Sequence, residues 1–265
     1  MNLDNVVIEI TRRCNMQCAH CLRGEPECKS ISDKVLNQFF FNIRGSSIGI
    51  LTITGGEPSI APSRIQSIVH HSLLYRVDIG SFYMVTNAKR ITRQFLDAVQ
   101  RLYDICDDKG SCGLNYSNDK FHEKGAVWGD LDKLEMYCGE YFVGGKDHKD
   151  YPLDYNRLLT EGRSESMGCR DLTMSRYEIE EGDVREGLFY LNALGKILPS
   201  CDMSYNTQRE ECMILGDVFD SEFNLVRYAE EYNLKLEQLR RIYGDGEICF
   251  SLLRGPNEEL QAALA

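Results

Sequence analysis

Length, composition and charge already argue against several classes of protein. The chain has 265 residues, 43% of them hydrophobic and 27% charged, enough for one large domain or a barrel-sized domain with a small appendage. Its formal net charge of −11, without a compensating stripe of Lys and Arg, argues against a nucleic-acid partner. The sequence contains no basic, apolar leader and no apolar run of ~18 residues. We therefore expect a cytoplasmic protein that does not enter a membrane.

The chain contains eleven cysteines, an odd number with uneven spacing. In a reducing compartment such cysteines seldom form a disulfide framework. They are better interpreted as metal ligands together with buried thiols.

Over about the first 160 residues, short β-branched runs alternate with amphipathic segments, which predicts βα units and a parallel sheet. The predicted strands cover residues 5–10, 48–54, 81–86, 112–117 and 140–143. Three predicted helices bury apolar faces, and Ser32 is the expected N-cap of the first. These faces consist of Val35, Leu36, Phe39, Phe40 and Ile43, then Ile65, Ile68, Val69 and Leu73, then Phe95, Val99 and Leu102. Near the end, residues 221–243 predict two short helices broken near Asn233.

A cysteine triplet follows the first predicted strand directly. Cys14, Cys18 and Cys21 form a CxxxCxxC pattern in a loop that can wrap one metal centre. Three thiolates leave one iron of a cubane cluster without a protein ligand, whereas an electron-transfer cluster normally has four. Zinc is the alternative and needs a fourth ligand, either His20, which is adjacent to Cys21, or Cys28.

This triplet resembles the cluster loop of the radical S-adenosylmethionine (SAM) superfamily. The resemblance implies that Cys14, Cys18 and Cys21 hold a 4Fe-4S cluster whose fourth iron binds the amino and carboxylate groups of SAM. His20 occupies the position of a residue, commonly aromatic in the family, that packs near the adenine.

A second motif follows the second predicted strand, where ligands of parallel sheets gather. Gly55 and Gly56 let a ligand approach the backbone, Glu57 supplies a carboxylate for an ammonium group, and Pro58 fixes the turn. The alternative is a tight turn without a ligand. The sequence GGEP at this place is similar to the motif that binds the SAM amino group in the family.

Three further residues enter the site through the same resemblance. Asn87, at the end of the third strand, is similar to a family position near the ribose or methionine of SAM, although Asn is also a good turn residue. Ser117 would lie near the SAM ribose. Arg163, in a Gly-Arg-Ser segment, would bind the SAM carboxylate unless it forms only a surface ion pair.

The last hundred residues resemble the C-terminal module of SPASM and Twitch proteins, a hairpin with Gly-Lys-Ile followed by Leu-Gly-Asp-Val. Cys169, Cys201 and Cys212 would be the candidate ligands of an auxiliary cluster. Because the CxxC pairs of such modules are missing, we expect a module that retains its hairpin without metal.

The resemblance implies an α/β protein, a partial (β/α)6 radical SAM barrel over residues 1–165 with a small C-terminal α+β module over residues 166–265. The expected reaction is reductive cleavage of SAM to a 5′-deoxyadenosyl radical that abstracts a substrate hydrogen. The electron donor would be a flavodoxin or ferredoxin. A first strand near residue 5 leaves no room for an N-terminal leader-binding domain, so a leader would be recognised by the barrel or by a separate protein.

The preferred substrate is a ribosomally made peptide, because modules of the SPASM type often accompany peptide-modifying members. The alternative is a small molecule, a sugar, nucleoside or amino-acid derivative, in natural-product or cofactor biosynthesis. A non-enzymatic metal-binding or redox-sensing protein is the alternative of another class. It explains the triplet but leaves Glu57 and its two preceding glycines unexplained.

Overall fold

The computed structural model describes residues 1–118, 145–147, 159–165, 171, 173–244, 248–249 and 252. Its strands are β1 (Asn2–Thr11), β2 (Ser47–Gly55), β3 (Asp78–Thr86), β4 (Gly113–Asn118), β5 (Gly145–Asp147), β6 (Glu178–Glu180), β7 (Asp183–Leu191), β8 (Lys196–Leu198) and β9 (Gly216–Asp217). Its α-helices are α1 (Asp33–Asn42), α2 (Pro62–Tyr75), α3 (Arg93–Ile105) and α5 (Leu225–Tyr243).

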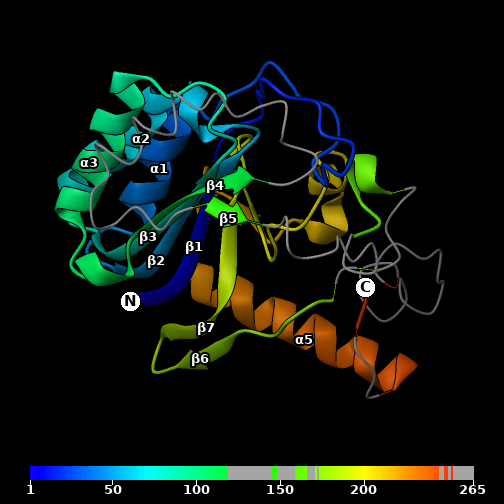
Figure 1. Cartoon of the computed structure of the whole chain (residues 1–265). Helices are drawn as coiled ribbons and strands as arrows, with labels where there is room; N and C mark the ends of the chain where they lie inside the picture. The colour runs from blue at the N-terminus through cyan, green and yellow to red at the C-terminus, as the bar shows by residue number, and fades with distance from the viewer. Residues whose placement is uncertain are drawn as a thin grey trace.

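The strands form one sheet in the order β5-β4-β3-β2-β1-β7-β8-β9, and β6 pairs with β7. The first five strands are parallel and match four of the predicted strands, while the predicted strand at 140–143 lies outside the described residues. Helices α1, α2 and α3 cover one face of the sheet (Figure 1). This βα arrangement agrees with the predicted partial barrel.

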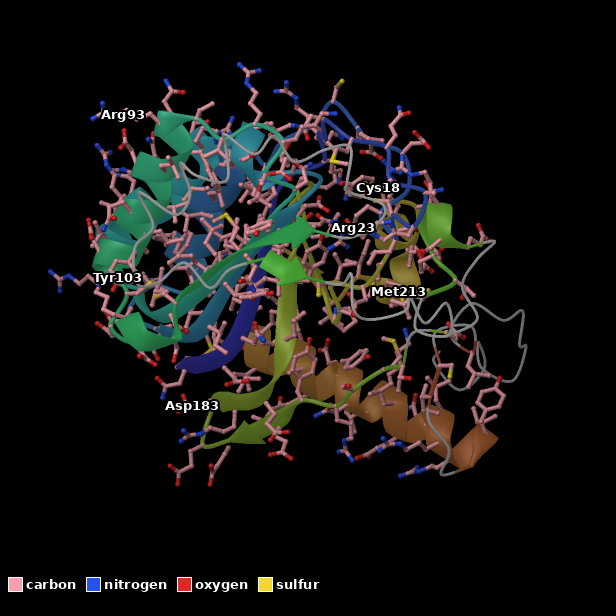
Figure 2. The ribbon with its side chains drawn as sticks, in the orientation of Figure 1. Cys18, Arg23, Arg93, Tyr103, Asp183 and Met213 are labelled. Carbon is pink, nitrogen blue, oxygen red and sulfur yellow. The ribbon has the colours of Figure 1, made fainter. Side chains whose placement is uncertain are left out.

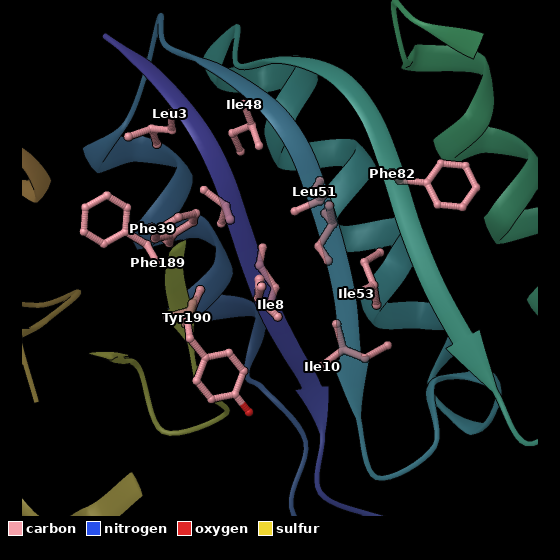
Figure 3. Packing of buried hydrophobic residues seen from close by; sticks show 14 of the residues in the cluster. Leu3, Ile8, Ile10, Phe39, Ile48, Leu51, Ile53, Phe82, Phe189 and Tyr190 are labelled. Atoms are coloured by element: carbon pink, nitrogen blue, oxygen red, sulfur yellow. The ribbon is translucent and has the colours of Figure 1, made fainter. Parts of the chain in front are cut away.

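The core lies between the sheet and these helices. Strand β1 is buried along its second half and supplies Ile8 and Ile10 to the same core as Ile53 of β2 and Phe39 of α1 (Figure 3). Such continuous burial is typical of parallel strands that are covered on both faces. Ser32 caps α1 as predicted, because its side chain accepts a hydrogen bond from the Val35 amide.

The predicted apolar faces are confirmed with one exception. Leu73 is 62% exposed, because α2 turns this position away from the sheet in its last turn. The other predicted core residues of α1, α2 and α3 are buried.

The C-terminal part joins the same sheet instead of forming one of its own. Strand β7 runs parallel to β1 with Val6 opposite Phe189, and β7 and β8 form the predicted hairpin. This pairing of β7 with β1 gives β1 a neighbour on both sides. The division of the chain at residue 165 stays a prediction.

The prediction of two short helices near the C-terminus is wrong. Helix α5 is continuous from Leu225 to Tyr243 and passes behind β7 in the view of Figure 1. Asn233 does not break it, because its side chain accepts from the Tyr177 amide at 2.9 Å and donates to the Tyr177 carbonyl at 2.8 Å. Among the helices of the described residues, none is long and apolar enough to cross a membrane.

Candidate active site

A cavity of about 380 Å³ lies at the carboxyl ends of the parallel strands. Every residue that the sequence assigned to SAM or to the barrel cluster lines it. These residues are Cys14, Cys18, His20, Cys21, Gly55, Gly56, Glu57, Pro58, Asn87, Ser117 and Arg163. The structure therefore brings together side chains spread over about 150 positions of the chain. Their individual roles toward SAM and iron stay predictions.

The three cysteines stand on the loop between β1 and α1, and all three are half-buried. Hydrogen bonds from the Cys21 amide to the Cys18 carbonyl and from the Gly24 amide to the Cys21 carbonyl, both 3.2 Å, fold the loop into consecutive turns. Burial raises the pKa of the Cys14 thiol. Metal binding to this loop would therefore release a proton, since thiolate is the ligand form.

Within the described residues, no three His, Cys, Asp or Glu side chains are gathered closely enough to hold a single metal ion. In a cubane cluster each cysteine binds a different iron, so its thiols stand further apart than around one tetrahedral ion. Cys28 is exposed and lines a different hollow, which it shares with Cys14 but with neither Cys18 nor Cys21. The donor set of the cavity, Cys14, Cys18 and Cys21, thus fits a cubane cluster with three protein ligands.

Gly55 and Gly56, at the end of β2, are required because a side chain at either position would clash with the neighbouring backbone. A Cβ on Gly55 would lie 2.3 Å from the Thr11 carbonyl oxygen, and one on Gly56 would lie 2.3 Å from the Arg13 carbonyl oxygen. Both contacts are with backbone, so no side-chain movement can relieve them. The glycines let the end of β2 pack against the chain that leads into the cysteine loop.

Glu57 is 1% exposed, and its carboxylate accepts three hydrogen bonds from other groups of the protein. Oε1 accepts from the Ser59 amide at 2.9 Å and from the Thr86 hydroxyl at 2.5 Å, and Oε2 accepts from the Asn87 amide at 2.8 Å. A carboxylate offers about four acceptor positions, so one remains for a ligand. Glu57 therefore connects the turn after β2 to the end of β3 through hydrogen bonds. The sequence alone did not predict this structural role.

Arg163 holds the cysteine loop from the other side of the cavity. Its Nε donates to the Cys18 carbonyl and its amide donates to the Cys21 carbonyl, both at 2.9 Å, while Nη1 pairs with Glu25 at 3.3 Å. The preceding Gly162 has φ +59°, and a Cβ there would lie 2.3 Å from the Leu22 carbonyl oxygen. The Gly-Arg-Ser segment, η5 (Gly162–Ser164), is thus docked on the loop.

The remaining predicted residues, Asn87, His20 and Ser117, also line the cavity. The Asn87 side chain donates to Asn15 Oδ1 at 2.8 Å, which ties the end of β3 to the cysteine loop. His20 and Ser117 are half-buried and face the cavity.

The far wall of the cavity comes from the C-terminal part of the chain, and sequence reasoning missed most of it. Cys201, Asp202 and Tyr205 line the cavity together with Arg12 and Arg23. The Tyr205 amide donates to the Arg23 carbonyl at 3.0 Å, and the Arg12 guanidinium lies 4.5 Å from the Tyr205 ring centre. This segment closes the cavity against the cysteine loop.

Beneath that wall lies a buried polar network. Glu9 and Arg12 are both fully buried and joined at 2.7 Å, and Glu9 also accepts from the Tyr190 hydroxyl at 2.6 Å. Gln208 of η6 (Thr207–Arg209) accepts from Arg12 at 2.5 Å and donates to Glu9 at 3.3 Å. The sequence alone did not predict this network; a glutamate within the β-branched run of β1 is the one signal that could have indicated it.

The three candidate ligands of an auxiliary cluster are placed differently. Cys201 lines the main cavity and Cys212 lies in η7 (Glu211–Met213), packed against the core, while Cys169 lies outside the described residues. Burial, with the neighbouring Asp202, raises the pKa of the Cys201 thiol to about 11. Whether these cysteines bind metal stays a prediction.

No protein-family model matches the chain, and no curated protein matches it either. Solved structures of radical SAM enzymes do match it. Native anSMEcpe with bound AdoMet, which is SAM, and Cp18Cys peptide superimposes with a TM-score of 0.52 at 12% identity, over 88% of this chain and 84% of that chain. The same protein with AdoMet and Kp18Cys peptide gives 0.53 at 12% identity, over the same shares.

Streptococcus suis SuiB bound to precursor peptide SuiA superimposes less well, with a TM-score of 0.42 at 13% identity over 84% of this chain and 63% of that chain. The parallel sheet and the two anSMEcpe superpositions show that the chain has the fold of a radical SAM enzyme. The resemblance found in the sequence is thus confirmed at the level of the fold.

Proposed function

We propose that this protein is a radical SAM enzyme that cleaves SAM reductively and modifies a ribosomally made peptide. The observation that carries the proposal is the single cavity in which Cys14, Cys18 and Cys21 face the glycine turn and Glu57. Chance would not place two such motifs, from two different strand ends, around one hollow. The fold agrees, because the superimposed anSMEcpe structures contain AdoMet.

Each part of the cavity has a task in this proposal. Cys14, Cys18 and Cys21 would hold a 4Fe-4S cluster, which supplies one electron to SAM and so generates a 5′-deoxyadenosyl radical. Glu57 would accept a hydrogen bond from the SAM amino group with its remaining acceptor position, and Ser117 and Asn87 would contact the ribose or methionine end. The segment around Tyr205 would exclude water from that space.

A peptide is the preferred substrate because anSMEcpe binds the Cp18Cys and Kp18Cys peptides in the structures that superimpose on this chain. A flavodoxin or ferredoxin would deliver the electron. Neighbouring genes would distinguish a peptide substrate from a small-molecule substrate. A short precursor-peptide gene beside this gene favours the peptide, whereas genes of sugar or nucleoside metabolism favour the small molecule.

The test of the reaction is anaerobic reconstitution with iron and sulfide, addition of SAM and dithionite, and chromatography for 5′-deoxyadenosine. We expect the wild type to be brown and to form 5′-deoxyadenosine. The combined change of Cys14, Cys18 and Cys21 to Ala should abolish both. Formation of 5′-deoxyadenosine by this variant would refute the ligand assignment, and none from an iron-loaded wild type would favour the non-enzymatic alternative.

A further inference from the structure

Arg23, two residues beyond Cys21, lines the main cavity although the sequence assigned it no role. Its Nη1 donates to the Met203 carbonyl at 2.8 Å, and its guanidinium lies 5.2 Å from the centre of the Tyr190 ring. Arg23 and Cys18 lie in the same region of the molecule, far from Asp183 at the other end of the sheet (Figure 2). The guanidinium is therefore held in a fixed orientation beside the cysteine loop.

The carboxylates of the polar network beside Arg23 are paired with other arginines. Arg12 pairs with Glu9 at 2.7 Å and with Glu27 at 3.2 Å, and Arg209 pairs with Glu27 as well. Both carboxylates of this group are thus already taken by other arginines. Arg23 itself makes no ion pair within the described part of the chain.

The other acids of the cavity do not compensate it. Glu57 is directed to the end of β3 by its three hydrogen bonds, and exposed Asp202 lies beyond ion-pair distance of Arg23. A guanidinium keeps its proton in proteins, so the cavity presents a permanent positive charge.

An unpaired cation in a partly buried site is costly unless an anion joins it. We propose that Arg23 binds a carboxylate group of a ligand in this cavity. The proposal rests on the proposed function and refines it, because Arg163, the residue expected to bind the SAM carboxylate, has its Nε and Nη1 engaged by Cys18 and Glu25. The carboxylate belongs either to the methionine end of SAM or to an acidic group of the substrate.

Two ligand pairs, each differing by one carboxylate, distinguish these sources. The first is SAM and decarboxylated SAM, whose dissociation constants are measured on the reconstituted wild type, Arg23→Gln and Arg23→Lys. The second is N-acetylglutamate amide and N-acetylglutamine amide, added at saturating SAM. Wild type should prefer the carboxylate member of one pair by about tenfold to a hundredfold, as a charge-assisted hydrogen bond implies.

In Arg23→Gln that preference should fall to about one, and Arg23→Lys, which keeps the charge, should retain part of it. The Lys variant keeps the test decisive if the Gln variant does not fold. Arg241→Gln, an exposed arginine of α5, is the matched control and should behave as wild type. Loss of preference for SAM identifies SAM as the source, and loss of preference for the glutamate probe identifies the substrate.

The inference is overturned if wild type cleaves SAM and Arg23→Gln retains every carboxylate preference of the wild type. It is also overturned if Arg163→Gln, and not Arg23→Gln, loses the preference. A wild type that does not cleave SAM contradicts instead the proposed function, so the two failures are distinguishable.

Discussion

Glu57 connects the turn after β2 with the end of β3 before any ligand binds. Three donors of the protein, from Ser59, Thr86 and Asn87, already surround its carboxylate. A charge-assisted bond to a SAM ammonium group would add to them rather than replace them. Binding and local stability are therefore linked at this one residue.

Glu57→Gln should weaken SAM binding by about tenfold to a hundredfold and leave the iron content nearly unchanged. It should also lower the free energy of unfolding by about 1–3 kcal/mol, because an amide NH₂ would face a donor at Thr86 or Asn87. Equilibrium dialysis with SAM and denaturant titration measure the two effects.

Thr86→Val is the matched control for this change. It removes the hydroxyl that donates to Glu57 Oε1 and leaves the carboxylate in place. It should lower stability without a comparable loss of SAM affinity. Equal affinity losses in the two variants would assign Glu57 a purely structural role.

The residues of the cavity were predictable from sequence only where a short motif carried them. The triplet and the glycine turn each occupy a few consecutive positions after a strand, so the strand-end rule found them. Arg23 and Glu9 form hydrogen bonds with Met203 and Tyr190, which lie about 180 positions further along the chain. Without knowledge of which strand pairs with β1, no local pattern reveals those contacts.

At the scale of elements, η5 and the cysteine loop form one docked unit. Gly162 permits their contact, since its backbone lies against Leu22 and Gly24 with φ +59°. Arg163 then reaches the Cys18 and Cys21 carbonyls from this position. The shape of the loop thus depends on a segment about 140 residues away.

Gly162→Ala should separate these two elements and lower the iron content after reconstitution. Gly182→Ala is the matched control, because Gly182 also has positive φ, +83°, but a Cβ there meets nothing within 4 Å. Both changes cost about 1–2 kcal/mol in backbone strain, and only Gly162→Ala adds a clash with backbone. Iron and sulfide assays should find a deficit in Gly162→Ala alone; equal iron in both variants would contradict the docking argument.

Helix α5 illustrates a limit of reasoning from a single element. From the sequence alone, Asn233 is expected to break the helix, because an Asn side chain competes for the hydrogen bonds of the helix backbone. In the structure its amide is occupied by the backbone of Tyr177, a residue of the segment that precedes β6. A tertiary contact has overridden a local propensity, and the sequence of α5 contains no sign of it.

At the scale of the whole molecule, the network of Glu9, Arg12, Tyr190 and Gln208 joins the first strand to the C-terminal part. Every member is buried, and each carboxylate oxygen of Glu9 has partners. Satisfied buried networks of this kind favour one arrangement of the elements they connect. Through Gln208, this network holds the segment that forms the far wall of the cavity against the first strand.

Tyr190→Phe should lower the free energy of unfolding by about 1–3 kcal/mol, because Glu9 loses a donor at 2.6 Å in a buried place. Tyr232→Phe is the control, since the buried Tyr232 hydroxyl has no hydrogen-bond partner in the described structure. It should change stability little or raise it. Denaturant titrations of the two variants measure the difference. Equal losses of the free energy of unfolding would show that the hydrogen bond from Tyr190 to Glu9 does not stabilise the fold.

The iron content of the whole chain tests the interpretation of the C-terminal cysteines. Cys201 lines the main cavity and Cys212 lies in η7, and both also pack against the core. Cys212 does not line that cavity, and the CxxC pairs typical of auxiliary-cluster modules are missing from the sequence. We therefore expect one cubane cluster, or about four irons per chain.

Changing Cys14, Cys18 and Cys21 together to Ala should bring the iron content of the reconstituted protein close to zero. Changing Cys201 and Cys212 together to Ser should leave it at about four, because these thiols would not belong to the cluster. About eight irons in the wild type, with about four remaining in the triple variant, would instead mean that the C-terminal part holds a second cubane. An auxiliary cluster would then stand at the wall of the cavity, where Cys201 lies, and would become a candidate for electron relay or substrate ligation.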